Sequence, residues 1–166
     1  NGLVLANNDE PNVLDTLEKG CWTPVETTSL INEKHGWFAR KLIPDGSKFT
    51  VMFKGEEQGT VDWQLIGDFN IENALMAISA SRHVGVPSKV AIEALGEFIN
   101  TKRRMELRGV VNDIRVYDDF AHHPTAITKT LAGLRAHVGD GKIIAVLEPR
   151  SNTMKSGIHK DTLSSS

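Results

Sequence analysis

Two polar clusters in the last third of the chain stand where predicted strands end. One is Asp-Asp-Phe-Ala-His-His-Pro-Thr at residues 118–125, and the other begins with Glu-Pro-Arg-Ser-Asn-Thr at residues 148–153. In open α/β sheets, ligands bind at the carboxyl ends of the strands. Two such clusters on one edge of one sheet therefore predict a binding site there.

The first cluster also allows other interpretations. A carboxylate followed by Pro-Thr can cap a helix, and His122 can be an ordinary turn residue. Asp118, Asp119, His122 and His123 offer ligand types that zinc or manganese accepts, which would suit a metal-dependent hydrolase. Adjacent histidines seldom point at the same centre, and the sequence has no second cluster with metal-ligand spacing, so we expect no metal site here.

Two further segments carry side chains suited to a nucleotide. Asn70 and Asn73 share one face of the first turn of a predicted helix, where their amides can pair with the edge of an adenine ring. The arginine pair of Lys102-Arg103-Arg104 can hold phosphate oxygens. Each has a plain alternative, because asparagine often caps a helix and a basic linker is often only solvated.

Hydrophobic periodicity predicts the elements that position these residues. Residues 2–5 read as a strand, residues 11–19 as a helix, and residues 22–66 have the alternating pattern of antiparallel hairpins. From Gly67 the spacing becomes helical, which predicts one helix ending near Gly85 and a second helix after it.

The last third of the chain predicts alternating strand and helix. Two strands, over 105–111 and 113–118, are followed by a helix from Thr125 to Val138 and by a continuous apolar strand over 142–147. A continuous apolar strand is typical of a parallel sheet with helices on both faces. A strand–helix–strand unit implies a right-handed crossover and a Rossmann-like sheet.

The order and spacing of the three polar segments resemble the Mur ligase family. In that family a Gly-x-His-Asn-x-x-Asn-x-x-Ala segment closes the central nucleotide domain, an Arg-Arg linker follows, and an Asp-Tyr-Ala-His-x-Pro segment opens the carboxy-terminal domain. The match runs from about Gly67 to Thr125, with one departure, since Phe69 stands where the family has histidine.

The resemblance implies an α/β fold in three parts. Residues 1–101 would be the end of a Mur ligase central domain with antiparallel hairpins and helices, and residues 102–104 a linker. Residues 105–166 would be the first half of a Rossmann-like carboxy-terminal domain. The chain opens at Asn1 and stops within a helix-like stretch, so we expect it to be part of a longer enzyme and to be inactive alone.

The resemblance also implies a role for each site residue. Asn70 and Asn73 would face adenine, and Arg104 would contact phosphate oxygens and stabilise the charge of phosphoryl transfer. Asp119 would accept hydrogen bonds from the ribose hydroxyls, and His122 would lie beside the nucleotide and shape the turn. The candidates for holding a carboxylate of the incoming peptide are Arg150, Ser151, Asn152 and Lys155.

Within the family, the polar segments look most like the branch that joins UDP-N-acetylmuramate to L-alanyl-γ-D-glutamyl-meso-diaminopimelate in peptidoglycan recycling. ATP and Mg²⁺ would convert the muramate carboxylate into an acyl phosphate, which the amine of the tripeptide then attacks. The branch that adds L-alanine to the same sugar nucleotide is the alternative. No Gly-x-x-x-x-Gly-Lys-Ser/Thr loop occurs in the sequence, so that loop and the main Mg²⁺ ligands are expected before Asn1.

Composition narrows the classes of function. The formal net charge is -2, which gives no basic field for nucleic acid or an anionic membrane. We expect no signal peptide, and the sequence has no apolar run of the roughly 20 residues that span a bilayer. Its single cysteine suits a reducing cytoplasm. A non-catalytic nucleotide-binding module remains a second alternative from another class.

Overall fold

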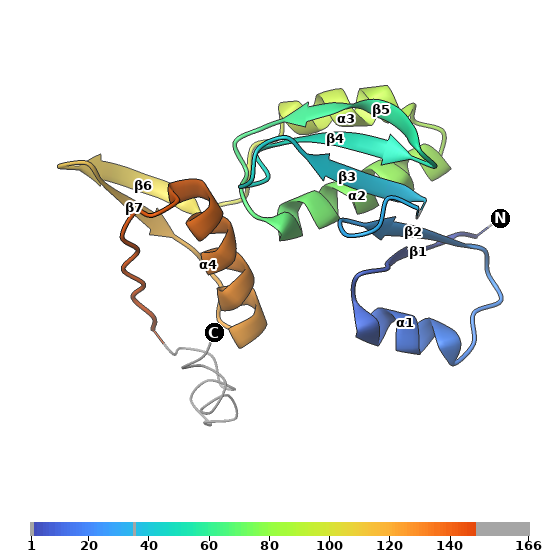
Figure 1. Ribbon diagram of the computed structural model, residues 1–166, viewed down its shortest axis with the longest axis horizontal. Coiled ribbons are helices and arrows are strands. Elements are labelled where there is room, and N and C mark those ends of the chain that lie inside the picture. Colours follow the sequence, from blue (N-terminus) through green and yellow to red (C-terminus); the bar gives the residue numbers. More distant parts are fainter. Residues whose placement is uncertain (1, 35, 149–166) are drawn as a thin grey trace. The chain divides into compact units, whose positions relative to one another are not determined.

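The computed structural model describes residues 2–34 and 36–148 and divides the chain into two compact units (Figure 1). The first unit comprises Asn1–Phe98 and the second Ile99–Ser166. The expected linker at residues 102–104 stays a prediction.

The first unit is built on a five-stranded sheet in the order β1-β2-β3-β4-β5 (Figure 1). β1 pairs parallel to β2 and β2 parallel to β3, whereas β3, β4 and β5 pair antiparallel. The strands are β1 (Val4–Asn7), β2 (Val25–Ser29), β3 (Trp37–Lys41), β4 (Lys48–Phe53) and β5 (Glu56–Asp62).

The pairing of β2 corrects the expectation that all of residues 22–66 form antiparallel hairpins. Helix α1 (Pro11–Glu18) supplies the crossover that lets β2 run parallel to β1. β3 begins beside the end of β2, with Thr28 opposite Trp37, so a short connection suffices for a second parallel pair. Alternating apolar residues indicate a strand with one buried face, but they do not encode the direction of its neighbour.

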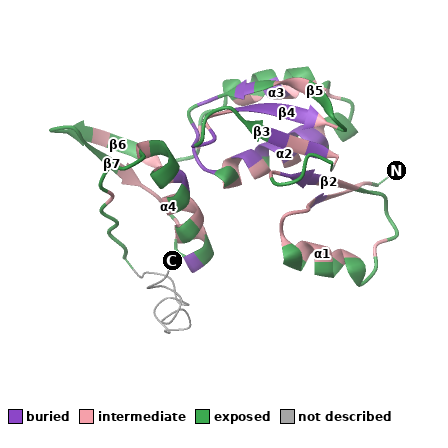
Figure 2. Ribbon diagram, in the orientation of Figure 1, coloured by how far each residue is buried: buried purple, intermediate pink, exposed green. Residues whose placement is uncertain are grey.

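Helix α2 (Asp68–His83) packs against β1, β2 and β3, and helix α3 (Ser88–Gly96) packs against β5. Both helices confirm the change to helical spacing at Gly67. Figure 2 shows buried positions on β4 and on α2. The core combines sheet and helix side chains, namely Trp37, Ala39, Phe49, Val51, Val61, Trp63, Leu65, Ile71, Ala74, Leu75, Ile78 and Ile92.

The described part of the second unit contains the hairpin of β6 (Glu106–Val111) and β7 (Ile114–Asp118), followed by α4 (Pro124–Val138). Asn112 and Asp113 form the hairpin turn with φ of 49° and 63°, and their short polar side chains tolerate this left-handed backbone better than most residues. These three predicted elements are confirmed, as is the α/β class. No helix within residues 2–34 and 36–148 has the length and apolar character needed to cross a bilayer.

The strand expected over residues 142–147 is not formed. Residues 141–148 have no regular secondary structure, and Ile144 and Val146 are 76% and 94% exposed. A strand needs a hydrogen-bonding neighbour, and β6 and β7 pair only with each other among the described strands. An apolar pattern can therefore mark a potential strand without supplying its partner.

Replacing Leu75 by alanine should destabilise the first unit by about 2–5 kcal/mol, because Leu75 is fully buried between α2 and the sheet. Leu42→Ala is the matched control, since Leu42 is 51% exposed, and its effect should stay within about 0.5 kcal/mol. Urea denaturation followed by tryptophan fluorescence measures both. Equal effects of the two changes would contradict the position assigned to this core.

Candidate functional site

Asp119 connects two loops of the second unit through its carboxylate. Its Oδ1 accepts a hydrogen bond from the Ala121 backbone N–H at 2.7 Å, and its Oδ2 accepts one from the Met105 backbone N–H at 2.8 Å. The residue is half-buried and directly follows β7. Each carboxylate oxygen has more than one acceptor position, so these bonds leave room for a ligand hydroxyl.

Arg103 lies against the same loop. Its Nε is 3.4 Å from Asp118 Oδ2, its guanidinium carbon is 5.2 Å from the centroid of the Phe120 ring, and its carbonyl accepts the Phe120 backbone N–H at 2.8 Å. The His122 ring also contacts the Phe120 ring, in an edge-on arrangement with 5.3 Å between the two ring centroids. The guanidinium of Arg103 is thus committed to the loop, which residue type alone did not reveal.

His122 takes part in the turn that leads from β7 to α4. Its Nδ1 lies 3.1 Å from the Phe120 carbonyl oxygen and donates to it when it carries the proton. The side chain is exposed. A turn-shaping position fits the expectation for His122, and its place beside a nucleotide stays a prediction.

Arg104 is the central, exposed residue of a turn formed with Arg103 and Met105. Both flanking residues have left-handed backbone, with φ of 60° and 48°. Arg104 is exposed, and its carbonyl accepts a hydrogen bond from Asn100 Nδ2 at 2.9 Å. Glu106 closes the turn by accepting the Arg103 backbone N–H on Oε2 at 2.9 Å. Of the arginine pair, only Arg104 presents an uncommitted guanidinium within the described residues.

Asn70 and Asn73 lie in the first turns of α2, in the first unit. Asn70 Nδ2 donates to the Ile66 carbonyl at 2.7 Å, and the helix begins after Gly67 with no side-chain cap. The capping alternative for Asn70 is therefore wrong. Asn70 is half-buried and Asn73 is exposed. Since Arg104, Asp119 and His122 belong to the second unit, a site shared with the two asparagines stays a prediction.

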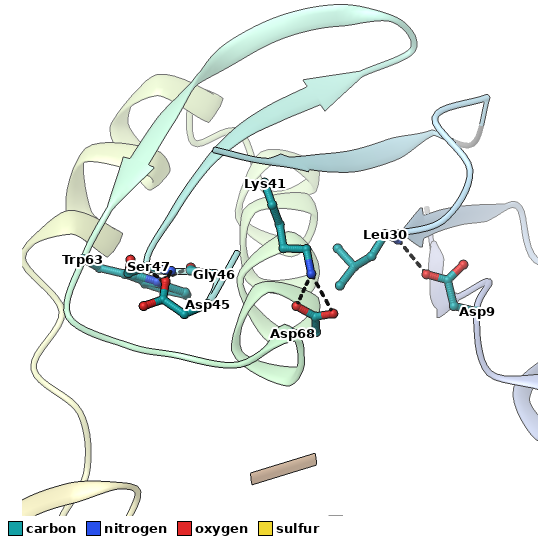
Figure 3. A network of polar contacts seen from close by, with 8 residues as sticks. All are labelled: Asp9, Leu30, Lys41, Asp45, Gly46, Ser47, Trp63 and Asp68. Carbon is teal, nitrogen blue, oxygen red and sulfur yellow. Dashed lines mark hydrogen bonds and ion pairs between the residues drawn. The ribbon is translucent and has the colours of Figure 1, made fainter. Parts of the chain in front are cut away.

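Polar contacts also fix the loops around the sheet of the first unit (Figure 3). Lys41 at the end of β3 pairs at 2.8 Å with Asp68, the first residue of α2. After β1, Asp9 accepts hydrogen bonds from Leu30 N–H and Ser29 Oγ, each at 2.6 Å. These contacts hold the ends of β1, β2 and β3, and sequence reasoning did not single them out.

The donors of the first polar cluster do not converge on a metal. His123 Nδ1 accepts the Thr125 backbone N–H at 3.3 Å and caps α4, so the predicted cap at Pro-Thr is an imidazole and not a carboxylate. Both oxygens of Asp119 face backbone N–H groups. Across residues 2–34 and 36–148, no three His, Cys, Asp or Glu side chains gather where a metal ion could bind. This donor geometry does not favour the hydrolase alternative.

The remaining candidates, Arg150, Ser151, Asn152 and Lys155, lie outside the described residues.

Two domain families match the chain. The Mur ligase middle domain matches residues 1–81, and the Mur ligase glutamate ligase domain matches residues 103–163. Among curated proteins, the UDP-N-acetylmuramate–L-alanyl-gamma-D-glutamyl-meso-2,6-diaminoheptandioate ligase of Escherichia coli strain K12 is 52% identical over 99% of this chain and 36% of its own length. A UDP-N-acetylmuramate–L-alanine ligase from Desulfosudis oleivorans is 34% identical over 74% of this chain and 27% of its own length.

A solved structure supports the same relationship. The crystal structure of a murein peptide ligase from Psychrobacter arcticus 273-4 superposes with a TM-score of 0.68 and 48% identity, covering 98% of this chain and 34% of that chain. The chain spans about a third of the length of the proteins that it matches here.

The Glu106 carboxyl should titrate below the ordinary range of a glutamate. The hydrogen bond from the Arg103 backbone N–H lowers its pKa, desolvation opposes this, and the charge of Arg108 lowers the pKa further. Because the folded-state pKa is lowered, the stabilisation is present above the unfolded glutamate pKa of about 4.3 and is lost as the pH falls through the folded value. Carbon-detected NMR titration measures this pKa, and a value equal to the ordinary glutamate pKa of about 4.3 would refute the contact.

Proposed function

This chain belongs to the Mur ligase family, and on that premise we propose that its parent protein is an ATP-dependent ligase joining UDP-N-acetylmuramate to L-alanyl-γ-D-glutamyl-meso-diaminopimelate. The observation that carries the choice of amine is the 52% identity over 99% of the chain to a ligase named for these two substrates. Identity to the L-alanine ligase of Desulfosudis oleivorans, from the other branch of the family, is 34% over 74% of the chain.

The reaction requires activation of a carboxylate. A carboxylate is a poor electrophile because its leaving group would be oxide, whereas an acyl phosphate releases phosphate. Transfer of the γ-phosphoryl group of ATP to the lactyl carboxylate therefore precedes attack by the alanine amine of the tripeptide. Negative charge builds on the transferred group, and a preorganised guanidinium stabilises it.

Arg104 supplies that guanidinium in the proposed mechanism. It is exposed on a turn whose backbone is fixed by Glu106 and Asp119, so the backbone at Arg104 needs little reorganisation when phosphate arrives. Asp119 accepts the ribose hydroxyls, and His122 lies beside the nucleotide. Asn70 and Asn73 face the adenine from the first turns of α2, where Asn70 is half-buried and Asn73 is exposed.

Mg²⁺ bound with ATP would neutralise phosphate charge. The Gly-x-x-x-x-Gly-Lys-Ser/Thr phosphate loop does not occur in this sequence, so we assign the main Mg²⁺ ligands to the part of the parent protein that carries that loop. The candidates Arg150, Ser151, Asn152 and Lys155 hold a carboxylate of the tripeptide in this proposal. A cytoplasmic location follows from the use of ATP and a sugar nucleotide.

A product assay on the full-length parent protein tests the proposal. With ATP, Mg²⁺ and UDP-N-acetylmuramate, we expect stoichiometric ADP release and an amide product when the tripeptide is the amine. With free L-alanine at the same concentration, product formation should be lower by about 100-fold or more, because the site would leave unpaired the groups that hold the rest of the tripeptide. Equal or faster reaction with L-alanine would reassign the protein to the other branch.

A further inference from the structure

The turn that carries Arg104 has a backbone conformation that its sequence does not favour. Arg103 and Met105 both have positive φ, at 60° and 48°, and such residues are uncommon outside glycine, asparagine and aspartate. The hairpin turn at Asn112 and Asp113 uses residues suited to this region, but Arg103 and Met105 offer no such local support. A conformation of this kind persists only where surrounding contacts determine it, and it is concentrated at functional sites.

Two carboxylates supply these contacts. Glu106 Oε2 accepts the backbone N–H of Arg103 at 2.9 Å, and Asp119 Oδ2 accepts the backbone N–H of Met105 at 2.8 Å. Each left-handed residue therefore donates its N–H to an ionised side chain, and hydrogen bonds to charged acceptors are stronger than neutral ones.

The two arginines of the turn have different surroundings as a result. Arg103 is held by Asp118 and by the Phe120 ring. Arg104 is exposed, and no hydrogen bond or ion pair of its side chain is found in residues 2–34 and 36–148. The clamp thus fixes the backbone on both sides of Arg104 while its guanidinium stays available.

We propose that Glu106 and Asp119 are positioning residues that hold the Arg103–Met105 turn and thereby aim Arg104 at the transferring phosphoryl group. This role rests on the proposed function of Arg104. Asp119 Oδ1 also accepts the Ala121 N–H in the loop before α4, so the same carboxylate links the turn to the loop that is proposed to receive the ribose.

The main test uses full-length parent protein and the Glu106→Ala and Glu106→Gln variants. Glu106→Ala should lower kcat by about tenfold or more at saturating ATP, with little change in KM for ATP, because a misplaced catalytic group slows chemistry. Glu106→Gln keeps an acceptor oxygen and should recover much of the loss. Glu57→Ala, at an exposed position of β5, is the matched control and should leave kcat unchanged.

A double-mutant cycle separates positioning from general structural damage. If Glu106 acts through Arg104, adding Glu106→Ala to Arg104→Ala should lower kcat no further. Met105→Gly should restore kcat in an Asp119→Ala background, since glycine adopts the left-handed backbone without a clamp. The KM for ATP should stay raised in both variants, because the proposed acceptor for the ribose hydroxyls is lost. An unchanged kcat in Glu106→Ala, or a further loss of similar size in the Arg104→Ala background, would overturn the proposal.

Amide hydrogen exchange keeps this test independent of the proposed function. Glu106→Ala should speed exchange of the Arg103 amide, and Asp119→Ala that of the Met105 amide, while amides within β6 change little. Absence of ligation by the unmodified protein would count against the proposed function alone. Unchanged exchange at both amides would overturn the clamp whatever the enzyme does.

Discussion

A carboxylate that accepts backbone N–H groups from a distant segment is the interaction on which the functional loops depend. Loops at strand ends leave backbone donors without ladder partners, and a buried or half-buried donor must find an acceptor. Asp119, just after β7, accepts the Met105 N–H, and Asp9, just after β1, accepts the Leu30 N–H. In both units a side chain at a strand end therefore decides where a second loop lies.

In the candidate site, a single carboxylate holds two loops through such hydrogen bonds. One carboxylate, Asp119, fixes the backbone beside Arg104 and also orders the loop that contains His122 through the Ala121 N–H. A backbone held in advance limits the freedom that Arg104 would lose on meeting a phosphate, which is the physical content of preorganisation.

Sequence periodicity predicted most elements, because helix and strand spacing follow directly from which side chains are buried. The face of α2 that carries Ile71, Leu75 and Ile78 is an example, and all three are fully buried. The direction of β2 and the missing strand at 142–147 were not predictable in this way, since both depend on neighbours that lie elsewhere in the chain.

The candidate site residues could be chosen from residue type and position, but their contacts could not be predicted. Asp119, Arg104 and His122 were chosen as candidates from their motifs. The sequence alone does not distinguish Arg103, which is held by Asp118 and Phe120, from Arg104, which is exposed. The different surroundings of the two arginines arise from the backbone angles of the turn. Those angles depend in turn on a distant acceptor, since the Met105 N–H donates to Asp119, fourteen residues away. The helix-capping interpretation of Asn70 failed for the same reason, because its amide donates to Ile66 instead.

Oxygen transfer tests the central claim of phosphoryl activation most directly. UDP-N-acetylmuramate labelled with ¹⁸O in both carboxylate oxygens would be converted by the full-length parent protein with ATP and the tripeptide, and the released phosphate analysed by mass spectrometry. An acyl phosphate intermediate predicts one ¹⁸O atom in each phosphate, because the leaving phosphate carries away a carboxylate oxygen. Phosphate that forms together with the amide but contains no ¹⁸O would contradict the account.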